Sequence, residues 1–366
     1  MTQIIQVIVG TQFGSEAKGH VTAQLVKKAV ENQDNSELNT VKEVINIRVA
    51  GPNAGHTVYD TDGNKFAFRQ VPVGSVVDDS VTCYIAPGSE IDLEVLLAEI
   101  DLLQDKGHNP TIFVSGEATL ITDEDKNAER EAMLSAKIGS TGKGIGAARA
   151  ARIMRTAKRV VDSEEAVLEL LKRKVELREP HELYADDDFA LPNKEQYLLV
   201  EGTQGYGLGL HAGFYPQVTS SDCRAIDFLS MAGISPWREN ADITVWVVAR
   251  PYPIRVAGNS GPLQEETTWE ELGLEPEYTT VTNKERRVGL WDGELVAKAV
   301  QANGGKANTK LAFTMADQVL PLLKNQTKIE DTETEMMLNS WILKIETEAN
   351  TTVGLVTTSP TTCMWI

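Results

Sequence analysis

The chain has 366 residues, and 35 Lys and Arg face 53 Asp and Glu, which gives a net charge of −18. So acidic a surface repels nucleic acid unless a long basic run overrides it, and none is present, so no nucleic-acid partner is expected. The N-terminus has neither a basic leader nor a long apolar stretch, and Cys83, Cys223 and Cys363 form no CxxC pair, so we expect a cytoplasmic protein with no membrane contact.

Strand-like and helix-like segments alternate along the chain. Strands are predicted at residues 4–9, 44–49, 111–115, 197–201, 243–249 and 312–315. Helices are predicted at residues 21–30, 93–106, 123–137, 163–177 and 293–303, and the polar stretch 179–194 is interpreted as a connection. This alternation favours an α/β fold with a largely parallel central sheet flanked by helices. We expect residues 1–366 to form a single domain with helical and loop subdomains.

A glycine-rich segment, residues 10–19 (GTQFGSEAKG), lies between the first predicted strand and the first predicted helix. Backbone N–H groups and the helix dipole favour an anion at such a turn, and Lys18 can reach a terminal phosphate. The strict Walker spacing is absent, because His20 follows Gly19. The segment therefore predicts a P-loop-like phosphate loop, with a purely structural glycine turn as the alternative.

Six segments resemble, in chain order, motifs of the adenylosuccinate synthetase family. They are residues 10–19, 51–57 (GPNAGHT), 138–146 (IGSTGKGIG), 201–205 (EGTQG), 215–221 (YPQVTSS) and 281–289 (VTNKERRVG). The family's usual first motif is GTQWGDEGKG. The resemblance implies the family's fold, with one catalytic domain over residues 1–366, and its reaction, which makes adenylosuccinate from IMP, aspartate and GTP.

Three departures from the family pattern concern chemistry. Ser15 stands where the family has an aspartate that removes the N1 proton of IMP and helps to hold magnesium. Ala312 stands where an aspartate recognises the guanine of GTP, and Lys284 stands in place of an arginine near the substrate ribose. Together they resemble a bacteriophage branch of the family, which uses dGMP and makes N6-succino-2-amino-2'-deoxyadenylate for diaminopurine (Z) DNA.

The family reaction has two steps. The purine 6-oxygen attacks the γ-phosphate of the donor, and the aspartate amine then displaces phosphate at C6. The resemblance implies that Lys18, Ser15, Gln204 and His56 are the catalytic residues. His56 would donate a hydrogen bond to the 6-oxygen as charge develops on it. Mg²⁺ is expected as cofactor, held by the Ser15 hydroxyl and the Gly55 carbonyl. Serine is a poor base, so another group must take the N1 proton.

The resemblance assigns the remaining residues to three substrates. The donor would contact Ser15, Glu16, Ala17, Lys18, Gly19, Gly55, His56, Thr57, Arg286, Lys310, Ala312, Thr358, Ser359 and Pro360. The acceptor dGMP would contact Ser15, Asn53, Ser140, Thr141, Arg155, Gln204, Thr219 and the Val256 carbonyl. Aspartate would contact Thr282, Asn283, Lys284 and Arg286.

Two of these positions carry further implications. Alanine at position 312 accepts no hydrogen bond from guanine, so ATP or dATP is the expected donor. Arg155 matches a family arginine that reaches the neighbouring subunit's phosphate site, which implies a homodimer.

Two other functions fit the same motifs. An ordinary adenylosuccinate synthetase would tolerate Ser15 and use IMP. A non-catalytic nucleotide sensor would bind dGMP or ATP and release no phosphate when aspartate is present. If the protein is viral, its compartment is the host cytoplasm.

Overall fold

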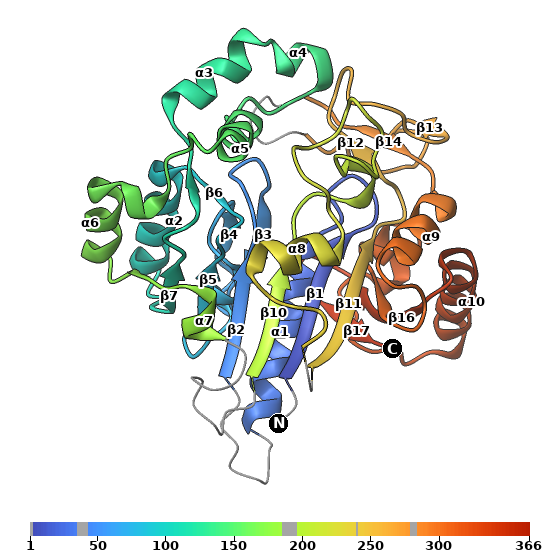
Figure 1. Cartoon of the computed structure of the whole chain (residues 1–366). Coiled ribbons are helices and arrows are strands. Elements are labelled where there is room, and N and C mark those ends of the chain that lie inside the picture. Colours follow the sequence, from blue (N-terminus) through green and yellow to red (C-terminus); the bar gives the residue numbers. More distant parts are fainter. Residues whose placement is uncertain (1–2, 35–42, 185–195, 239–240, 279–283) are drawn as a thin grey trace.

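The computed structural model describes residues 3–34, 43–184, 196–238, 241–278 and 284–366. A large sheet runs through the middle of the molecule, with helices on both sides (Figure 1). Its strands, in spatial order, are β17 (Cys363–Trp365), β16 (Thr352–Thr357), β15 (Thr309–Phe313), β11 (Ala241–Ala249), β1 (Gln3–Gly10), β10 (Gln196–Glu201), β2 (Glu43–Arg48), β5 (Thr82–Ile85), β7 (Thr111–Val114) and β9 (Glu176–Leu177).

Neighbouring strands of this sheet are parallel except at one edge, where β17 runs antiparallel to β16. β1 lies between β10 and β11, and Val7 is in register with Val200 on one side and Val245 on the other. Because the strands are parallel, their carboxyl ends meet at one edge of the sheet. In Figure 1 this edge faces α5 and the small β12–β14 sheet. The expected α/β fold with a largely parallel central sheet is confirmed.

Within the described ranges, short strands outside the large sheet form three small sheets, and helices connect the strands of the large sheet. The short strands are β3 (His56–Tyr59), β4 (Lys65–Phe68), β6 (Glu90–Ile91), β8 (Thr119–Leu120), β12 (Ile254–Arg255), β13 (Glu266–Thr267) and β14 (Arg287–Gly289). The α-helices are α1 (Lys18–Asp34), α2 (Leu93–Asp105), α3 (Asp123–Glu131), α4 (Leu134–Ile138), α5 (Ile145–Met154), α6 (Glu164–Lys172), α7 (Pro180–Leu183), α8 (Ala225–Ala232), α9 (Gly293–Ala302) and α10 (Thr332–Ala349).

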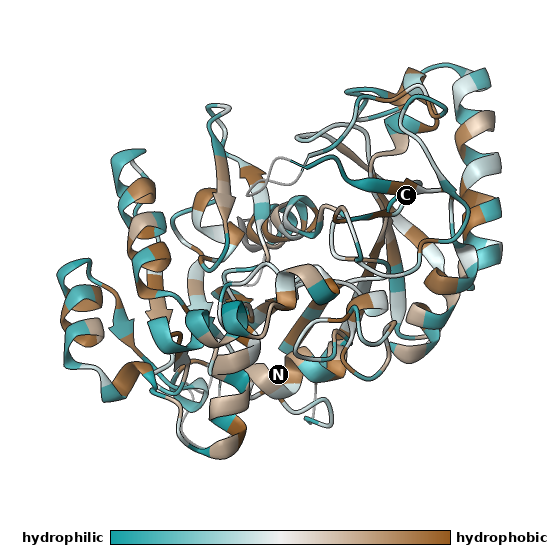
Figure 2. Ribbon diagram, turned by 90° about the horizontal axis from the view of Figure 1, so that it is seen from above, coloured by the Kyte–Doolittle hydropathy of each residue, from teal (hydrophilic) through white to brown (hydrophobic). Residues whose placement is uncertain are grey.

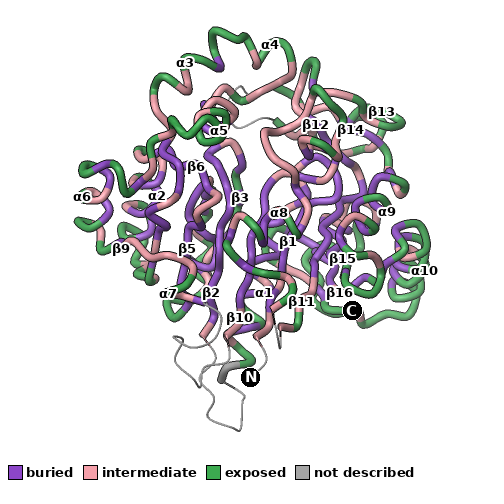
Figure 3. The backbone as a smooth tube through the Cα atoms, in the orientation of Figure 1, coloured by how far each residue is buried: buried purple, intermediate pink, exposed green. Residues whose placement is uncertain are grey.

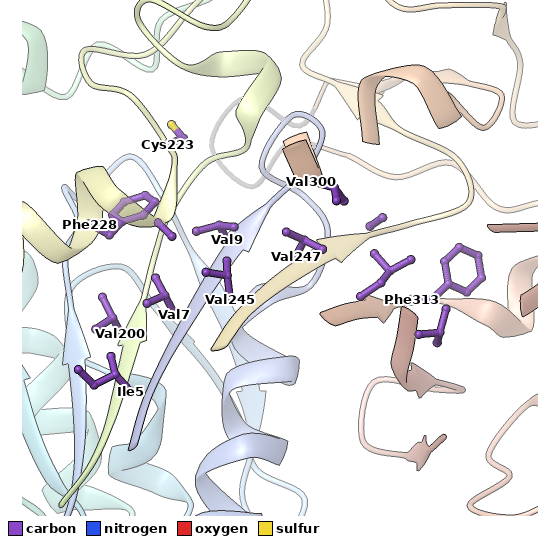
Figure 4. Packing of buried hydrophobic residues seen from close by; sticks show 14 of the residues in the cluster. Ile5, Val7, Val9, Val200, Cys223, Phe228, Val245, Val247, Val300 and Phe313 are labelled. Atoms are coloured by element: carbon purple, nitrogen blue, oxygen red, sulfur yellow. The ribbon is translucent and has the colours of Figure 1, made fainter. Parts of the chain in front are cut away.

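Alternate side chains of the central strands supply two apolar layers. Ile5, Val7 and Val9 of β1 point to the face covered by α8, α9 and α10, where Phe228 of α8 packs against them (Figure 4). Ile8 points to the opposite face, which α1, α2 and α6 cover. Because each face is buried under helices, β1 is apolar on both sides, as a central parallel strand requires.

Two of the helices, α9 and α10, begin at an aspartate that caps the first turn. The carboxylates of Asp292 and Asp331 accept hydrogen bonds from the first turns of α9 and α10, at 2.9 and 2.8 Å. Hydrophilic and hydrophobic residues alternate along the outer helices (Figure 2), and burial is concentrated in the central strands (Figure 3). None of the helices in the described part of the chain is long and apolar enough to cross a membrane.

Three predicted helices and one strand have clearly different bounds in the structure. The helix expected at 21–30 is longer, because α1 runs from Lys18 to Asp34. The helix expected at 123–137 is split into α3 and α4, because Met133 adopts a left-handed conformation (φ 53°). The helix expected at 163–177 ends at Lys172, since the chain turns at Lys174 (φ 61°) and enters β9. The strand expected at 312–315 starts three residues earlier and ends at Phe313.

Candidate active site

The phosphate loop, residues 11–17, is fixed to the neighbouring strand β11 through backbone and side-chain bonds. The Thr11 N–H and hydroxyl both donate to the Val248 carbonyl, at 3.0 and 2.9 Å. The Gln12 amide donates to the Arg250 carbonyl (2.9 Å) and accepts from the Arg250 N–H (3.1 Å). The loop is therefore held in place at the carboxyl end of β1, where the sequence predicts it.

Glycine is required where the loop meets residues 204–205. A Cβ on Gly10 would lie 2.6 Å from the Gln204 carbonyl oxygen, and one on Gly205 would lie 2.6 Å from the Gln12 carbonyl oxygen. Gly14 has a φ of +96°, which side-chain-bearing residues rarely adopt. This close approach places Gln204 beside the phosphate loop.

Lys18 and Glu16 form a buried ion pair inside the loop. The Lys18 ammonium donates to a Glu16 carboxylate oxygen at 2.8 Å and to the Gly14 carbonyl at 2.9 Å. The second Glu16 oxygen accepts from the N–H groups of Gly14 (2.7 Å) and Gln12 (3.2 Å). The carboxylate thus stabilises the turn and keeps Lys18 directed into the loop.

Two arginines and a glutamate surround Ser15. Its hydroxyl accepts a hydrogen bond from Arg286 Nη1 at 2.9 Å, and its carbonyl accepts one from Arg250 Nη1 at 3.2 Å. The Glu277 carboxylate pairs with the Arg250 guanidinium. The backbone carbonyl of Glu277 accepts a hydrogen bond from the Arg286 N–H at 2.8 Å. Burial lowers the pKa of Arg286. The segments around residues 277 and 286 are thereby attached to the phosphate loop.

His56 is 5% exposed and lies against the N-terminus of α1, where a Cβ on Gly19 would come within 2.6 Å of its own Cβ. Its Nδ1 and the Arg48 guanidinium converge on one oxygen of Glu201. Burial, and then the Arg48 charge, lower the pKa of His56 to about 3, so the ring is neutral at neutral pH. Burial would raise the pKa of Glu201, but Arg48 and the His56 hydrogen bond outweigh it and the pKa is lowered.

The donors expected to hold Mg²⁺ fit a metal poorly. The Gly55 carbonyl belongs to an exposed residue, but the Ser15 hydroxyl is already occupied by Arg286. The nearby Glu16 carboxylate is taken up by Lys18 and loop amides. No group of three or more Asp, Glu, His or Cys side chains able to bind a metal occurs among the described residues. Ser15 therefore presents a neutral oxygen bonded to a cation, which is unfavourable for Mg²⁺.

The segments expected to bind the acceptor nucleotide approach one another around the carboxyl edge of the sheet. A Cβ on Gly139 would lie 3.4 Å from Val256, and Asn259 donates to the Lys137 carbonyl at 2.9 Å, so the Ser140 and Val256 loops are in contact. The Val256 carbonyl accepts from the Ser260 hydroxyl.

The Asn53 segment joins this group, and the Thr219 segment lies against the loop that carries Leu208. A Cβ on Gly51 would lie 3.4 Å from Asn53 Oδ1 and 3.0 Å from Ile145, which links Asn53 to the start of α5, four residues after Thr141. The Thr219 N–H donates to the Leu208 carbonyl at 2.7 Å. The Asn53, Ser140 and Val256 segments are thus joined by contacts through Ile145 and Gly139.

Arg155 lies apart from these contacts. It is an exposed residue at the C-terminal end of α5, in a left-handed conformation (φ 63°), and follows the exposed side chains of Ile153 and Met154. Arg155 therefore lies at the surface of this chain.

The segments expected to bind the donor base flank the phosphate loop. Thr314, just after β15, donates to the Glu16 carbonyl at 3.0 Å, and the Met315 N–H donates to the Thr357 hydroxyl at 2.9 Å. Ala312 is fully buried, in the cluster that contains Trp246, Val248 and Leu355. Thr358 and Ser359 are buried in a hydroxyl network with Thr362, whereas Lys310 and Pro360 are exposed.

The other donor and aspartate residues are only partly described. Ala17 lies in the phosphate loop with a φ of 61°, and Thr57 is exposed on β3. Thr282 and Asn283 lie outside the described residues, and Lys284 is exposed beside Arg286 in the chain.

Five residues near the site were not predicted from the sequence. They are Arg48, Glu201, Arg250, Arg255 and Glu277. Glu201 begins one of the six motifs, which was its only signal. Arg255 lies 4.2 Å above the Phe13 ring of the phosphate loop and donates to the Gln217 carbonyl at 3.0 Å, and burial lowers its pKa to about 10. It connects the phosphate loop to the segment that carries Thr219.

Comparisons with known proteins identify one family. The model of the adenylosuccinate synthetase family matches residues 7–190 and 182–330. The adenylosuccinate synthetase of Pyrococcus sp. strain ST700 is 34% identical over 358 residues, which cover 97% of this chain and 95% of that protein.

Two solved structures share the fold. The succinoaminodeoxyadenylate synthetase (PurZ) of cyanophage S-2L, bound to dGMP and to dATP as an energy donor, aligns with a TM-score of 0.76 at 27% identity and covers 98% of this chain and 94% of its own. The fully ligated adenylosuccinate synthetase of Plasmodium falciparum aligns with a TM-score of 0.74 at 19% identity, covering 99% of each chain.

Proposed function

Because this chain belongs to the adenylosuccinate synthetase family, we propose that it is the ligase that joins L-aspartate to C6 of dGMP. ATP or dATP is the phosphoryl donor, a 6-phosphoryl purine is the intermediate, and the product is N6-succino-2-amino-2'-deoxyadenylate. The observation that carries the proposal is the state of Ser15, whose neutral hydroxyl is bonded to Arg286 where the family pattern has a carboxylate. The likeness to the cyanophage enzyme, whose structure contains dGMP and dATP, supports it.

The choice of purine follows from the size and charge at position 15. Guanine carries an amino group at C2 beside N1, where hypoxanthine carries only hydrogen. A serine side chain is smaller than an aspartate and can both donate and accept hydrogen bonds, so it leaves room for the 2-amino group. The neutral side chain also leaves Arg286 free of a carboxylate partner at this position.

The donor is assigned from position 312. A buried alanine in the apolar cluster offers no acceptor to the N1–H and N2–H groups of guanine, which a carboxylate would bind. ATP or dATP is therefore the proposed donor, with Lys310 and residues 358–360 around its base.

Phosphoryl transfer depends on positioning and on charge neutralisation at the γ-phosphate. Lys18 and the amides of residues 15–19 lie at the N-terminus of α1, where an anion is stabilised. His56 faces the same helix end, and as a neutral ring it donates to the 6-oxygen only in the tautomer with the proton on Nε2, in which Nδ1 accepts from Arg48 and no longer donates to Glu201. Gln204, against Gly14, completes the group around the reacting atoms. Mg²⁺ is proposed to arrive with the donor's phosphates.

The working enzyme is proposed to be a homodimer in which Arg155 serves the partner's nucleotide site. Ile153 and Met154 are 71% and 70% exposed next to it, and an apolar pair of this kind on the surface of α5 suits burial between two subunits. Analytical sedimentation would show a dimer. The Arg155→Ala variant would have a higher KM for dGMP and would remain a dimer.

Phosphate release by the purified protein tests the proposed reaction. dGMP, GMP and IMP are compared side by side with aspartate, Mg²⁺ and each of ATP, dATP and GTP, and the product is identified by mass. Release with dGMP and an adenine nucleotide, with a succinylated product, is the expected result. Release with IMP alone would refute the proposal in favour of ordinary adenylosuccinate synthesis, which the 34% identity to synthetases of that name supports.

The Ser15→Asp variant probes the steric argument separately. Turnover of dGMP should fall, because the longer carboxylate crowds the 2-amino group. A rise in dGMP turnover would show that the size argument is wrong, even if dGMP is the substrate.

A further inference from the structure

The side chains around Ser15 carry a net positive charge. Lys18, Arg250 and Arg286 supply three positive charges, and Glu16 and Glu277 supply two negative ones. Serine adds none, so the cluster is left with one positive charge that an aspartate at position 15 would cancel. An anion at the phosphate loop would meet this unbalanced charge directly.

Arg286 is held in place, and among the described residues no carboxylate is hydrogen-bonded to its guanidinium, although the charge of the nearby Glu277 partly offsets the effect of burial on its pKa. Its guanidinium donates to the Ser15 hydroxyl at 2.9 Å, and its backbone N–H and carbonyl are fixed by Glu277 (2.8 Å) and by the Trp269 indole (2.8 Å). Arg250, in contrast, is paired with the Glu277 carboxylate. A fixed guanidinium that is hydrogen-bonded to no carboxylate of the described chain is arranged to bind phosphate oxygens.

The same contact argues against a metal ligand at position 15. A hydroxyl oxygen that already accepts from a guanidinium is a poor partner for a divalent cation, since the two positive charges would repel each other at close range. The carbonyl of Ser15 is likewise bonded to the Arg250 guanidinium at 3.2 Å. Both oxygens of this residue are therefore committed to arginines.

We propose that Ser15 is a positioning residue for Arg286, and that Arg286 binds the donor's terminal phosphate in the place of a metal ion held at position 15. The proposal rests on donor binding at the phosphate loop, as in the proposed function, but does not depend on dGMP or on the identity of the donor base. It implies that the triphosphate binds the protein even when divalent metal is removed.

Calorimetric titration with non-hydrolysable triphosphates tests this directly. The probes are adenylyl and guanylyl imidodiphosphate, each titrated with Mg²⁺ and with EDTA, so that an error in the assigned base does not affect the result. The wild-type protein should bind one of them in EDTA. Arg286→Gln should weaken that binding by about tenfold or more, the loss expected for a hydrogen bond between charged groups.

The Ser15→Ala variant separates the two roles of the hydroxyl. If Ser15 positions Arg286, affinity falls by the same factor with Mg²⁺ and with EDTA. If Ser15 is a metal ligand, affinity falls only with Mg²⁺, and the proposal is overturned. In Ser15→Asp, binding in EDTA should weaken and Mg²⁺ should restore it.

The matched control is Lys298→Gln, which removes one positive charge from the exposed face of α9. It should bind as the wild type does, and thermal unfolding shows whether each variant is folded. Absence of binding to the wild type in EDTA, or unchanged binding in a folded Arg286→Gln protein, would overturn the proposal. Neither result bears on whether dGMP is the substrate, which phosphate release decides.

Discussion

Replacing Glu201 by glutamine tests how far His56 depends on the buried pair behind it. Glutamine has nearly the size of glutamate but lacks the negative charge toward which Arg48 and His56 Nδ1 both point. Removing one partner of a buried ion pair costs about 3–5 kcal/mol, because the other charge is left unpaired. Arg48 keeps the carbonyls of Ala54 and Arg69, both at 3.2 Å, so we expect the lower end, about 3 kcal/mol.

This loss can be expressed as a change in melting temperature. An unfolding entropy of about 2.1 cal/mol/K per residue gives roughly 0.8 kcal/mol/K for 366 residues, so Glu201→Gln should melt about 4 °C lower. Its kcat should fall by about ten- to a hundredfold, within what a positioned acid contributes, because the imidazole loses its fixed orientation. Calorimetry and steady-state kinetics near neutral pH measure both quantities.

Glu99→Gln is the matched control. Glu99 is a second buried carboxylate, which accepts from three consecutive N–H groups of residues 69–71 and makes no contact with His56. Its replacement should lower the melting temperature and leave kcat nearly unchanged. A Glu201→Gln enzyme with wild-type kcat would refute the positioning argument, and an unchanged melting temperature would refute the energetic one.

Three smaller changes test other features of the site. Ala17 has a φ of 61°, a conformation that costs a non-glycine residue about 1–2 kcal/mol. Ala17→Gly introduces the family residue and removes this cost, but glycine also makes the unfolded chain more flexible. The free energy of unfolding should therefore rise by about 1 kcal/mol. Calorimetry checks this, and a lower melting temperature would contradict it. Gly19→Ala would place a Cβ 2.6 Å from the Cβ of His56, so kcat should fall in a protein whose circular dichroism is unchanged; undiminished kcat would show that the histidine tolerates displacement. Burial lowers the pKa of His20 from 6.5 to about 4. Below pH 6.5 the unfolded chain therefore binds a proton at His20 that the folded chain does not bind. His20 therefore costs stability as the pH falls, by up to about 1.4 kcal/mol per pH unit down to pH 4, and His20→Gln should reduce the slope by that amount in urea unfolding at several pH values; parallel pH profiles would contradict the argument.

Local patterns were sufficient to predict the central strands and the phosphate loop. The run at residues 4–9 is apolar on both faces except at Gln6, as a buried parallel strand favours, and β1 covers it. The predicted helices failed where one residue adopts a left-handed conformation, as Met133 does between α3 and α4. Methionine carries no signal for that conformation, so apolar spacing alone could not locate the break.

The site was predicted only where motifs mark it. Lys18, His56 and Gln204 lie in or beside the phosphate loop, and their catalytic roles stay predictions. The pairing of Arg48 with Glu201 spans 153 residues and arises because β2 and β10 are neighbours in register. Sequence spacing does not contain that information, since it depends on the order of strands in the sheet.

The position of β1 in the sheet has a consequence for how the chain is made. Val7 pairs with Val200 and Val245, which the ribosome adds nearly two hundred residues or more after it. At about 5–20 residues per second, the first strand waits roughly 10–40 s for its first neighbour. During that time an apolar segment with open backbone groups is exposed, so the nascent chain depends on shielding of its N-terminus until β10 emerges.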